Sequence, residues 1–532
     1  MRSWANLFGA LAALGIAAMA PPALAQKSGG TLKMYFQDNP PSASIHEEAT
    51  TSTVVPFMGL YNNLVLFDQQ IPQNSLASIR PDLAQSWSWN TDGTQLTFKL
   101  TPGVKWHDGK PFTAKDVQCT WDMLTGRSET LKLRKNPRKS WYWNLDKVAT
   151  NGDLEATFHL KQPQPSLLVL LASGYSPVYP CHVSAADMRT KPVGTGPFKI
   201  AEWKQKEIVR LTRNPDYFKK GKPYLDGIEI PIVPARATAI LGFVTNRYDM
   251  TSPYAVTIPL LKDMKTQAPQ AICELSAMNN NTNLIVNREA PPFDNPDVRR
   301  AMLLSIDRKS FIDIINQGEA DIGGTMEPAP NGVWGLPKAM YDAVPGYGPD
   351  VQKNRAEARE IMKKLGYGPD KKLKLKVSTR NHLLYRDPAV LLTDQLKEIY
   401  IEGELDLVDT SLWFAKVARK DYSIGLNTTG SGVDDPDQMF FENFACKSER
   451  NYTGYCNPEI EKLFPLQSRE TDLEKRKKIV HEIDKKLLED GARPVIMWNA
   501  AASCWHPYVK GFRPMVNSLY NGSRFEDVWL DK

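Results

Sequence analysis

The first half of the chain alternates between short strand-like stretches and polar turns. Residues 94–100 (TQLTFKL) and 207–213 (EIVRLTR) each place apolar and polar side chains at alternate positions. That period of two is typical of a strand with one buried face. Turn-forming pairs, such as Pro102-Gly103 and Asp108-Gly109, separate the stretches. We therefore expect half-buried strands joined by tight turns in this region.

The pattern becomes helical from about residue 295. Asn295 can cap a helix that has Pro296 at its first position, and a second helix is expected from Arg308 to Gln317. A capping box over residues 471–474 opens an amphipathic helix that ends at Gly491. Further helices are expected at residues 356–365 and 388–401, and apolar strands at residues 373–377, 405–408 and 494–498. Helices that alternate with strands indicate an α/β lobe.

The N-terminus has the pattern of an export signal. Arg2 supplies a positive charge, residues 7–20 form an apolar run, and Ala23-Leu24-Ala25 fits a signal-peptidase cleavage site before Gln26. The run is shorter than the ~20 apolar residues that a spanning helix needs; a buried helix is the alternative. Residues 1–25 therefore predict a cleaved signal peptide and a periplasmic protein. No Cys follows the small residues, so no lipid anchor is expected.

Length and charge narrow the classes of protein that fit. Cleavage after residue 25 of the 532 would leave 507, which is more than one hydrophobic core usually supports, so two or three lobes are expected. The composition, 42% hydrophobic and 24% charged, is ordinary for a globular protein. The net charge of +6 is too small and too dispersed to indicate nucleic-acid binding. We expect a monomer that binds no nucleic acid.

Six cysteines are present, and one pair can be proposed from the sequence. No Cys-x-x-Cys pair occurs and no His stands at zinc spacing from a Cys, so no metal site is expected. Disulfides are permitted in an exported protein. Cys446 and Cys456 enclose the turn-forming residues 451–454, and their bond would stabilise the fold by about 3 kcal/mol. The pairing of the others stays open; they are Cys119, Cys181, Cys273 and Cys504.

Four blocks of the chain, in order, carry a resemblance to a known family. Residues 80–123 begin with RPDLAQSWSW, residues 191–224 begin with KPVGTGPFKI, residues 287–318 contain PPFDNPDVRRAM, and residues 430–463 contain DDPD and CKSERNYTGYC. Together these blocks resemble the family 5 extracellular solute-binding proteins of ABC importers, the dipeptide, oligopeptide and nickel-binding group. The blocks span nearly the whole mature chain.

The resemblance implies an architecture of two lobes. The fold would be an α/β, periplasmic-binding-protein-like fold of the class II or cluster C type, with three interleaved domains and a ligand cleft at the hinge. Domain I would comprise residues 26–68, 192–278 and 505–532, domain II the inserted residues 69–191, and domain III residues 279–504. Two crossing segments, near residues 275–286 and 495–503, would form the hinge; ordinary core strands are the alternative reading of both.

The resemblance also points to candidate acidic ligand contacts. In peptide-binding relatives, an acid in a glycine-containing loop before an Asp-Pro or Glu-Pro pair meets the amino group of the ligand. The loop here runs from Gly430 to Pro436, is about two residues shorter, and has Val433 near the position of that acid. Asp434, with Asp435 and Gly430 beside it, is the candidate contact. The alternative is that these acids cap a turn or the following helix. Glu48 in a first-domain loop is a further candidate, with a solvated surface acid as the alternative.

Basic and aromatic candidates come from domain III. Arg380, Tyr385 and Arg386 lie between an expected strand end and a helix capped by Asp387, where open α/β sheets bind ligands. An arginine there can hold a carboxylate or phosphate with two hydrogen bonds; a surface arginine is the alternative. Trp413 resembles a tryptophan common after the strand at residues 405–408, and either lines the cleft or packs the helix at residues 411–419.

These features predict a periplasmic solute-binding component of an ABC transporter. It would bind a short peptide or similar small organic solute between its lobes and deliver it to permease subunits in the inner membrane. The same fold with a non-peptide ligand is the alternative, namely a sugar, an opine-like compound, a nickel chelate or haem. A periplasmic hydrolase is the remote alternative. The sequence contains no Gly-x-Ser-x-Gly, His-Glu-x-x-His or P-loop motif, so no catalytic residue and no cofactor are expected.

Overall fold

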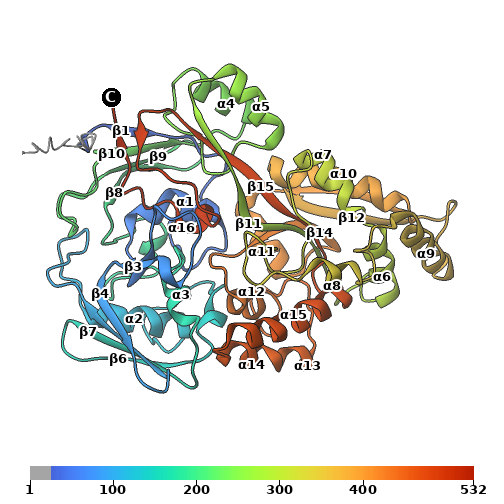
Figure 1. The fold of residues 1–532 in the computed structure, drawn as a ribbon, viewed down its shortest axis with the longest axis horizontal. Helices are drawn as coiled ribbons and strands as arrows, with labels where there is room; N and C mark the ends of the chain where they lie inside the picture. The colour runs from blue at the N-terminus through green and yellow to red at the C-terminus, as the bar shows by residue number, and fades with distance from the viewer. Residues whose placement is uncertain (1–25) are drawn as a thin grey trace, which may run out of the picture.

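The computed structural model describes residues 26–532, so the expected signal peptide lies outside the described residues. Two bodies are joined by the long strands β11 (Ile272–Val286) and β15 (Val495–Trp505), as Figure 1 shows. We call the body that holds residues 26–271 and 506–532 lobe 1, and the body that holds residues 287–494 lobe 2. No helix within residues 26–532 is both long enough and apolar enough to cross a membrane.

Lobe 1 contains two four-stranded sheets. The first has the order β1 (Thr31–Lys33), β10 (Gly227–Pro231), β9 (Ile208–Arg213) and β8 (Phe198–Lys204). The second has the order β4 (Ala84–Trp89), β5 (Gln95–Leu100), β7 (Glu155–Leu160) and β6 (Leu145–Thr150). The two strands expected from alternation, β5 and β9, are confirmed. Their burial alternates along each strand, because one face of the sheet packs against the core.

The remaining elements of lobe 1 connect these sheets. The helices are α1 (Thr51–Phe57), α2 (Ala114–Thr125), α3 (Leu167–Ala172), α4 (Arg236–Val244), α5 (Ile258–Gln267) and α16 (Ser518–Asn521). The short strands are β2 (Val65–Phe67), β3 (Ile79–Pro81), β16 (Val509–Lys510) and β17 (Trp529–Leu530). One hydrophobic core extends through both sheets. The expected domains I and II thus share a core, and their boundary stays a proposal.

Lobe 2 is built around one mixed sheet. Its strand order is β13 (Ile401–Val408), β12 (Leu373–Arg380), β14 (Ile424–Gly430), β11 and β15. The helices around it are α6 (Pro296–Ser305), α7 (Arg308–Asn316), α8 (Lys338–Asp342), α9 (Val351–Lys364), α10 (Leu383–Lys397), α11 (Thr410–Ala418), α12 (Pro436–Asn443), α13 (Pro458–Glu461), α14 (Leu463–Arg469) and α15 (Leu473–Glu489). The expected α/β lobe is confirmed.

Three helices of lobe 2 begin at other residues than expected, and α9 is one of them, because it begins at Val351 and not at residue 356. Asp472, not Thr471, caps α15, because its carboxylate accepts the backbone N–H of Lys475 at 2.9 Å. The expected helix from Pro388 begins earlier, at Leu383, and Pro388 lies inside it. His382 caps this helix by accepting the N–H of Leu384 through its ring nitrogen, so Asp387 is not the cap. The cap that Asn295 forms for α6 is confirmed.

The strands β11 and β15 connect the two lobes as an antiparallel pair. Their register runs from Ile272 opposite Trp505 to Asn283 opposite Val495. The second half of β11 also pairs with β14 of lobe 2, whereas the first half lies beside α5 of lobe 1. The two expected crossing segments thus lie side by side in the middle of the molecule (Figure 1).

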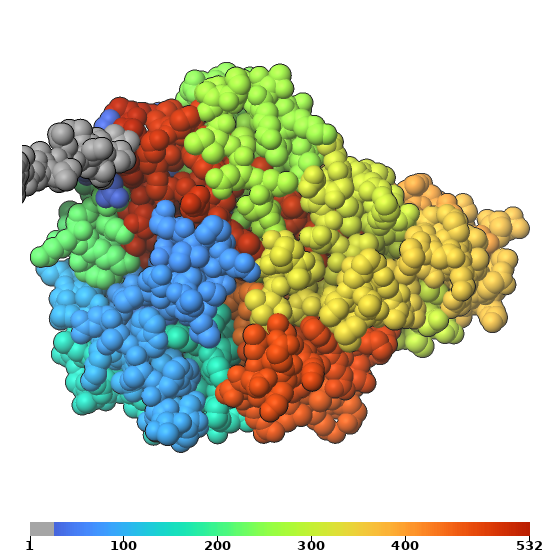
Figure 2. Space-filling model, viewed as in Figure 1, coloured from blue at the N-terminus to red at the C-terminus, as the bar shows by residue number. Residues whose placement is uncertain are grey.

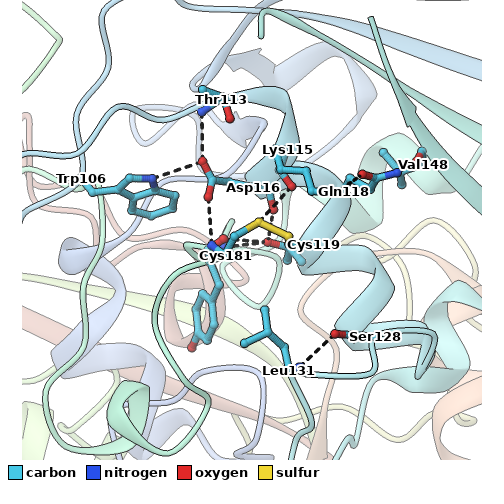
Figure 3. The surroundings of a disulfide bond; sticks show 12 residues. Trp106, Thr113, Lys115, Asp116, Gln118, Cys119, Ser128, Leu131, Val148 and Cys181 are labelled. Carbon is cyan, nitrogen blue, oxygen red and sulfur yellow. Dashed lines mark hydrogen bonds between the residues drawn. A yellow bond between two sulfur atoms is a disulfide. The ribbon is translucent and has the colours of Figure 1, made fainter. Parts of the chain in front are cut away.

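Three disulfides stabilise the fold. The expected bond between Cys446 and Cys456 is present. Cys273 and Cys504 lie opposite each other in β11 and β15 and are also bonded. The third bond joins Cys119 of α2 to Cys181 (Figure 3). Asp116 supports the third bond, because its carboxylate accepts the backbone N–H of Cys181 at 2.9 Å and that of Thr113 at 3.0 Å.

Candidate ligand-binding cleft

A cavity of about 370 Å³ lies between the two lobes. Lobe 1 contributes residues 36–38, 49–52, 252–255 and 257–260 to its wall, and lobe 2 contributes Arg380 and residues 382–385, 387–388 and 427–428. Met497 and residues 499–501 of the linking strand β15 form part of the wall as well. Cavities of about 300–1,000 Å³ with a mostly apolar lining are typical binding sites for small molecules. The position between two lobes makes this cavity the candidate site.

Arg380 crosses from one lobe to the other at the cavity wall. It is the last residue of β12, and its guanidinium donates to the carboxylate of Asp38 in lobe 1 at 2.5 Å. Other donors of the same guanidinium reach the hydroxyl oxygens of Thr410 at 3.0 Å and Tyr385 at 2.5 Å. Ser52 of lobe 1 also donates to Asp38, at 2.6 Å. The ion pair is buried, with 6% of the Arg380 and 17% of the Asp38 side chain exposed.

The electrostatics of this wall favour a charged arginine beside a neutral histidine. Burial opposes the charge of Arg380, but Tyr385 and Asp38 outweigh that effect and raise the pKa of the guanidinium. Burial lowers the pKa of His382, also on the wall, to about 4. His382 is therefore neutral at pH 7, and Arg380 keeps its charge for the contact with Asp38.

The lobes also meet away from the linking strands. Asp437 of α12 accepts hydrogen bonds from two lobe 1 side chains, Gln164 at 3.0 Å and Ser166 at 2.5 Å. Glu442 of the same helix accepts the indole N–H of Trp141 from lobe 1. Figure 2 shows the same side of the molecule, where the cyan part of lobe 1 lies against the orange and red part of lobe 2. The lobes thus contact each other both at the cavity wall and at α12, as in a closed two-lobed molecule.

The glycine-containing loop that follows β14 belongs to this lobe contact. Gly430 lines the cavity, and a Cβ atom there would lie 1.6 Å from the hydroxyl of Tyr520 in lobe 1. Only glycine at position 430 therefore lets this loop and the segment that carries Tyr520 approach so closely. Val433 is fully buried in the core of lobe 1, although it comes from the lobe 2 segment. The loop positions the lobes as well as the cavity wall.

The two acids of this loop do not line the cavity. Asp435 caps α12 by accepting the N–H of Asp437, and it forms a buried ion pair with Arg476. The carboxylate of Asp434 accepts the backbone N–H of Val333 at 2.9 Å. Burial raises the pKa of Asp434 to about 7. The proposed ligand contact of Asp434 and Asp435 is not supported by these positions, and the capping alternative describes Asp435.

Replacing Asp434 by Asn is expected to change how stability depends on pH. The folded-state pKa of about 7 lies above the value of 3.8 for an exposed aspartate, so the native chain binds the proton more tightly. Wild-type stability therefore falls, relative to Asp434→Asn, between about pH 4 and pH 7, by about 2–4 kcal/mol. Urea unfolding of both proteins at pH 5 and pH 8 measures this difference, with Asp370→Asn at an exposed position as the control. A difference that does not change with pH contradicts the prediction.

The other predicted site residues divide between the wall and the interior. Tyr385 lines the cavity, where its ring lies 4.5 Å from the Arg380 guanidinium. Trp413 is fully buried and packs α11, and its neighbour Phe414 lies on the wall instead. Arg386 is exposed and does not line the cavity. Glu48 is buried in lobe 1 and accepts from Ser42 at 2.9 Å, so it is neither on the wall nor solvated.

Several wall residues carry no sequence signal that could have identified them. They include Asp38, Arg236, Tyr254, Asn427, Arg450 and Tyr520. Arg450 lies inside the block of residues 430–463, where nothing marks it as a wall residue, and the other five lie outside the four blocks and share no motif. Only the three-dimensional arrangement of the lobes brings them together.

The fold and the cavity define a two-lobed binding protein, and comparison with known proteins identifies its family. Residues 78–451 match the bacterial extracellular solute-binding proteins, family 5. The chain belongs to this family of ABC-transporter solute-binding proteins, which are not enzymes. The expected family and fold are therefore confirmed.

Known relatives match along most of the chain. The oligopeptide-binding protein AppA of Bacillus subtilis is 26% identical over 516 residues, which cover 92% of this chain and 89% of that protein. The structure of the periplasmic binding protein DppA from Helicobacter pylori, in complex with the peptide STSA, has a TM-score of 0.83 at 21% identity and covers 95% of this chain and 99% of that one. The binding protein AgaA of A. tumefaciens R10, in complex with agropinic acid, has a TM-score of 0.80 at 21% identity, covering 94% and 99% of the two chains.

Proposed function

We propose that the protein is the periplasmic solute-binding component of an ABC importer. It binds a short peptide or similar small organic solute between its lobes and delivers it to the permease subunits in the inner membrane. The observation that carries this proposal is the cavity with walls from both lobes, which the ion pair between Arg380 and Asp38 spans. We also propose that the N-terminal signal directs export of the protein to the periplasm and that the mature protein is not lipid-anchored.

The mechanism is a ligand-dependent closure of the lobes. A ligand shifts an equilibrium between open and closed states only through contacts that differ between them. A solute in this cavity touches Asp38 and Tyr254 on lobe 1 and Tyr385 and Asn427 on lobe 2, so its contacts are complete only when the lobes are closed. The pair β11 and β15 acts as the hinge, because these strands connect the lobes on one side of the cavity.

The chemistry of the relatives supports a small organic solute and leaves its class to be determined. Peptides occupy the H. pylori structure and agropinic acid occupies the A. tumefaciens structure, on folds of nearly equal similarity to this chain. Val433 and Asp435 are buried, and the half-buried Asp434 accepts the backbone N–H of Val333, so the loop that follows β14 offers no carboxylate to the cavity. Non-peptide solutes therefore stay alternatives, namely a sugar, an opine-like compound, a nickel chelate or haem.

A ligand screen tests this proposal. We expect at least one compound among di- and tripeptides, opine-like acids, sugars and metal chelates to raise the melting temperature of the mature protein. A ligand at 100 times its Kd stabilises the native state by about 2.7 kcal/mol. The same compounds should leave the melting temperature of Gly430→Trp unchanged, because this side chain would collide with Tyr520 and fill the cavity. Turnover of a bound compound, in place of simple binding, would contradict the proposed role.

A further inference from the structure

The cavity wall carries more positive than negative charge, and almost all of that charge is already paired. Five charged residues line the cavity, namely Asp38, Arg236, Arg380, Asp387 and Arg450. Arg380 pairs with Asp38, and Arg450 pairs with Glu442 behind the wall. Asp387 lies 3.6 Å from the guanidinium of its exposed neighbour, Arg386. No carboxylate on the wall is therefore unpaired among residues 26–532.

Arg236 is the exception to this pairing. It is the first residue of α4 in lobe 1, and its side chain is half-buried at the cavity. Within the described part of the chain, its Nε has no hydrogen-bond partner and no carboxylate lies within ion-pairing distance. Burial lowers the pKa of this guanidinium, which still keeps its proton at neutral pH. The carboxylate of Asp387, across the cleft, raises the pKa of Arg236 in part, but its ion pair is with Arg386.

The surroundings of Arg236 favour an anionic partner in the ligand. A half-buried cation without a counter-charge is costly, and a carboxylate in the cavity compensates that cost with charge-assisted hydrogen bonds. A cationic group of the ligand is less favoured, because Asp38 is held by Arg380 and the half-exposed Asp387 already interacts with the charges of Arg386 and Arg236. His382, which also lines the cavity, is neutral at pH 7 because burial lowers its pKa to about 4.

We propose that Arg236 binds a carboxylate of the ligand and that the solute of this cavity is a small organic acid. The inference rests on the proposed solute-binding function and narrows the class of its ligand. A solute that carries a carboxylate without a compensating ammonium fits the wall best, because it matches the single unpaired positive charge. Arg236 is thus the residue that selects acids, whereas Arg380 closes the lobes.

Matched acids and amides test the proposal by isothermal titration calorimetry. The probes are alanyl-leucine, N-acetyl-alanyl-leucine and the primary amide of each, together with glucuronic acid and glucose. We expect each acid that binds to do so about 10- to 100-fold more tightly than its uncharged or cationic partner. The N-acetylated acid should bind at least as tightly as the free dipeptide. Arg236→Gln should remove the preference for acids.

Arg247→Gln is the matched control, because Arg247 lies just beyond the other end of α4, is exposed and does not line the cavity. It should keep the full preference for acids. If amides or glucose bind as tightly as the acids, or if Arg236→Gln keeps the preference, the acid inference is wrong and the solute-binding function stands. If none of the six probes binds and the broader screen also yields no ligand, both proposals fail. The melting temperature of each ligand-free variant shows that it is folded.

Discussion

Replacing Arg380 by Met is expected to weaken ligand binding by at least about 100-fold. The closed state of the variant would leave Asp38 buried without its counter-charge, and breaking a buried ion pair in this way costs about 3–5 kcal/mol. The open state exposes Asp38 to water and bears little of that cost. The change therefore lowers the population of the closed state, and each 1.4 kcal/mol lost from it reduces the affinity about tenfold. Calorimetric titration with a ligand from the screen measures the loss.

A double-mutant cycle separates this closure effect from a direct ligand contact. Asp38→Asn together with Arg380→Met removes both charges, so affinity should recover by about tenfold or more over Arg380→Met alone. Arg247→Met is the matched control, because this arginine is exposed and lies off the wall. Affinity of Arg380→Met within threefold of the wild type would show that the ion pair does not hold the lobes closed.

Loss of the disulfide between Cys273 and Cys504 should cause the largest loss of stability among the three bonds. The bond closes a loop with a sequence separation of 231, against 62 for Cys119–Cys181 and 10 for Cys446–Cys456. In the chain-entropy model, the stabilisation by a disulfide grows with the logarithm of the loop length. It is about 3 kcal/mol for the short loop and about 5 kcal/mol for the long one. In urea unfolding, the double variant Cys273→Ala/Cys504→Ala should therefore lose more unfolding free energy than the double variant Cys446→Ala/Cys456→Ala.

The same variant should still bind its ligand, because neither cysteine lines the cavity and the strand pairing of β11 and β15 does not need the bond. Cys446→Ala/Cys456→Ala is the matched control for the removal of a disulfide. Equal losses of stability for the two variants would contradict the dependence on loop length. A loss of ligand binding in the first variant alone would give this bond a role in the hinge.

The sequence predicts those structural features that depend on residues close together in the chain. The alternating burial of β5 and β9 and the Asn295 cap of α6 follow from local patterns, and the bond between Cys446 and Cys456 closes over a turn of a few residues. Even so, a local pattern fixes a helix start only to within one or two turns. Asp472 replaces Thr471 as a cap, and α10 begins five residues before Pro388, because several nearby side chains can accept the same N–H groups.

The cleft depends on contacts between distant parts of the chain, which local patterns do not contain. Arg380 stands at a strand end that marks it as a candidate, but its partner Asp38 is 342 residues away. The sequence therefore suggests an arginine that holds the ligand, where the structure shows one that already holds the other lobe. Asp434 looks available in the sequence, yet its carboxylate accepts the backbone N–H of Val333 and lies off the cavity wall. The pairing of Cys119 with Cys181 is fixed only by the packing of α2 (Figure 3).

Closure of the lobes around a solute is the central claim, and single-molecule energy transfer tests it most directly. All six cysteines are in disulfides, so Lys147→Cys on lobe 1 and Lys462→Cys on lobe 2 provide two exposed labelling sites. The account predicts a shorter distance between the labels when a ligand from the screen is added, and no such change in the Arg380→Met variant at the same concentration. An unchanged distance in the wild-type protein at saturating ligand would contradict the account.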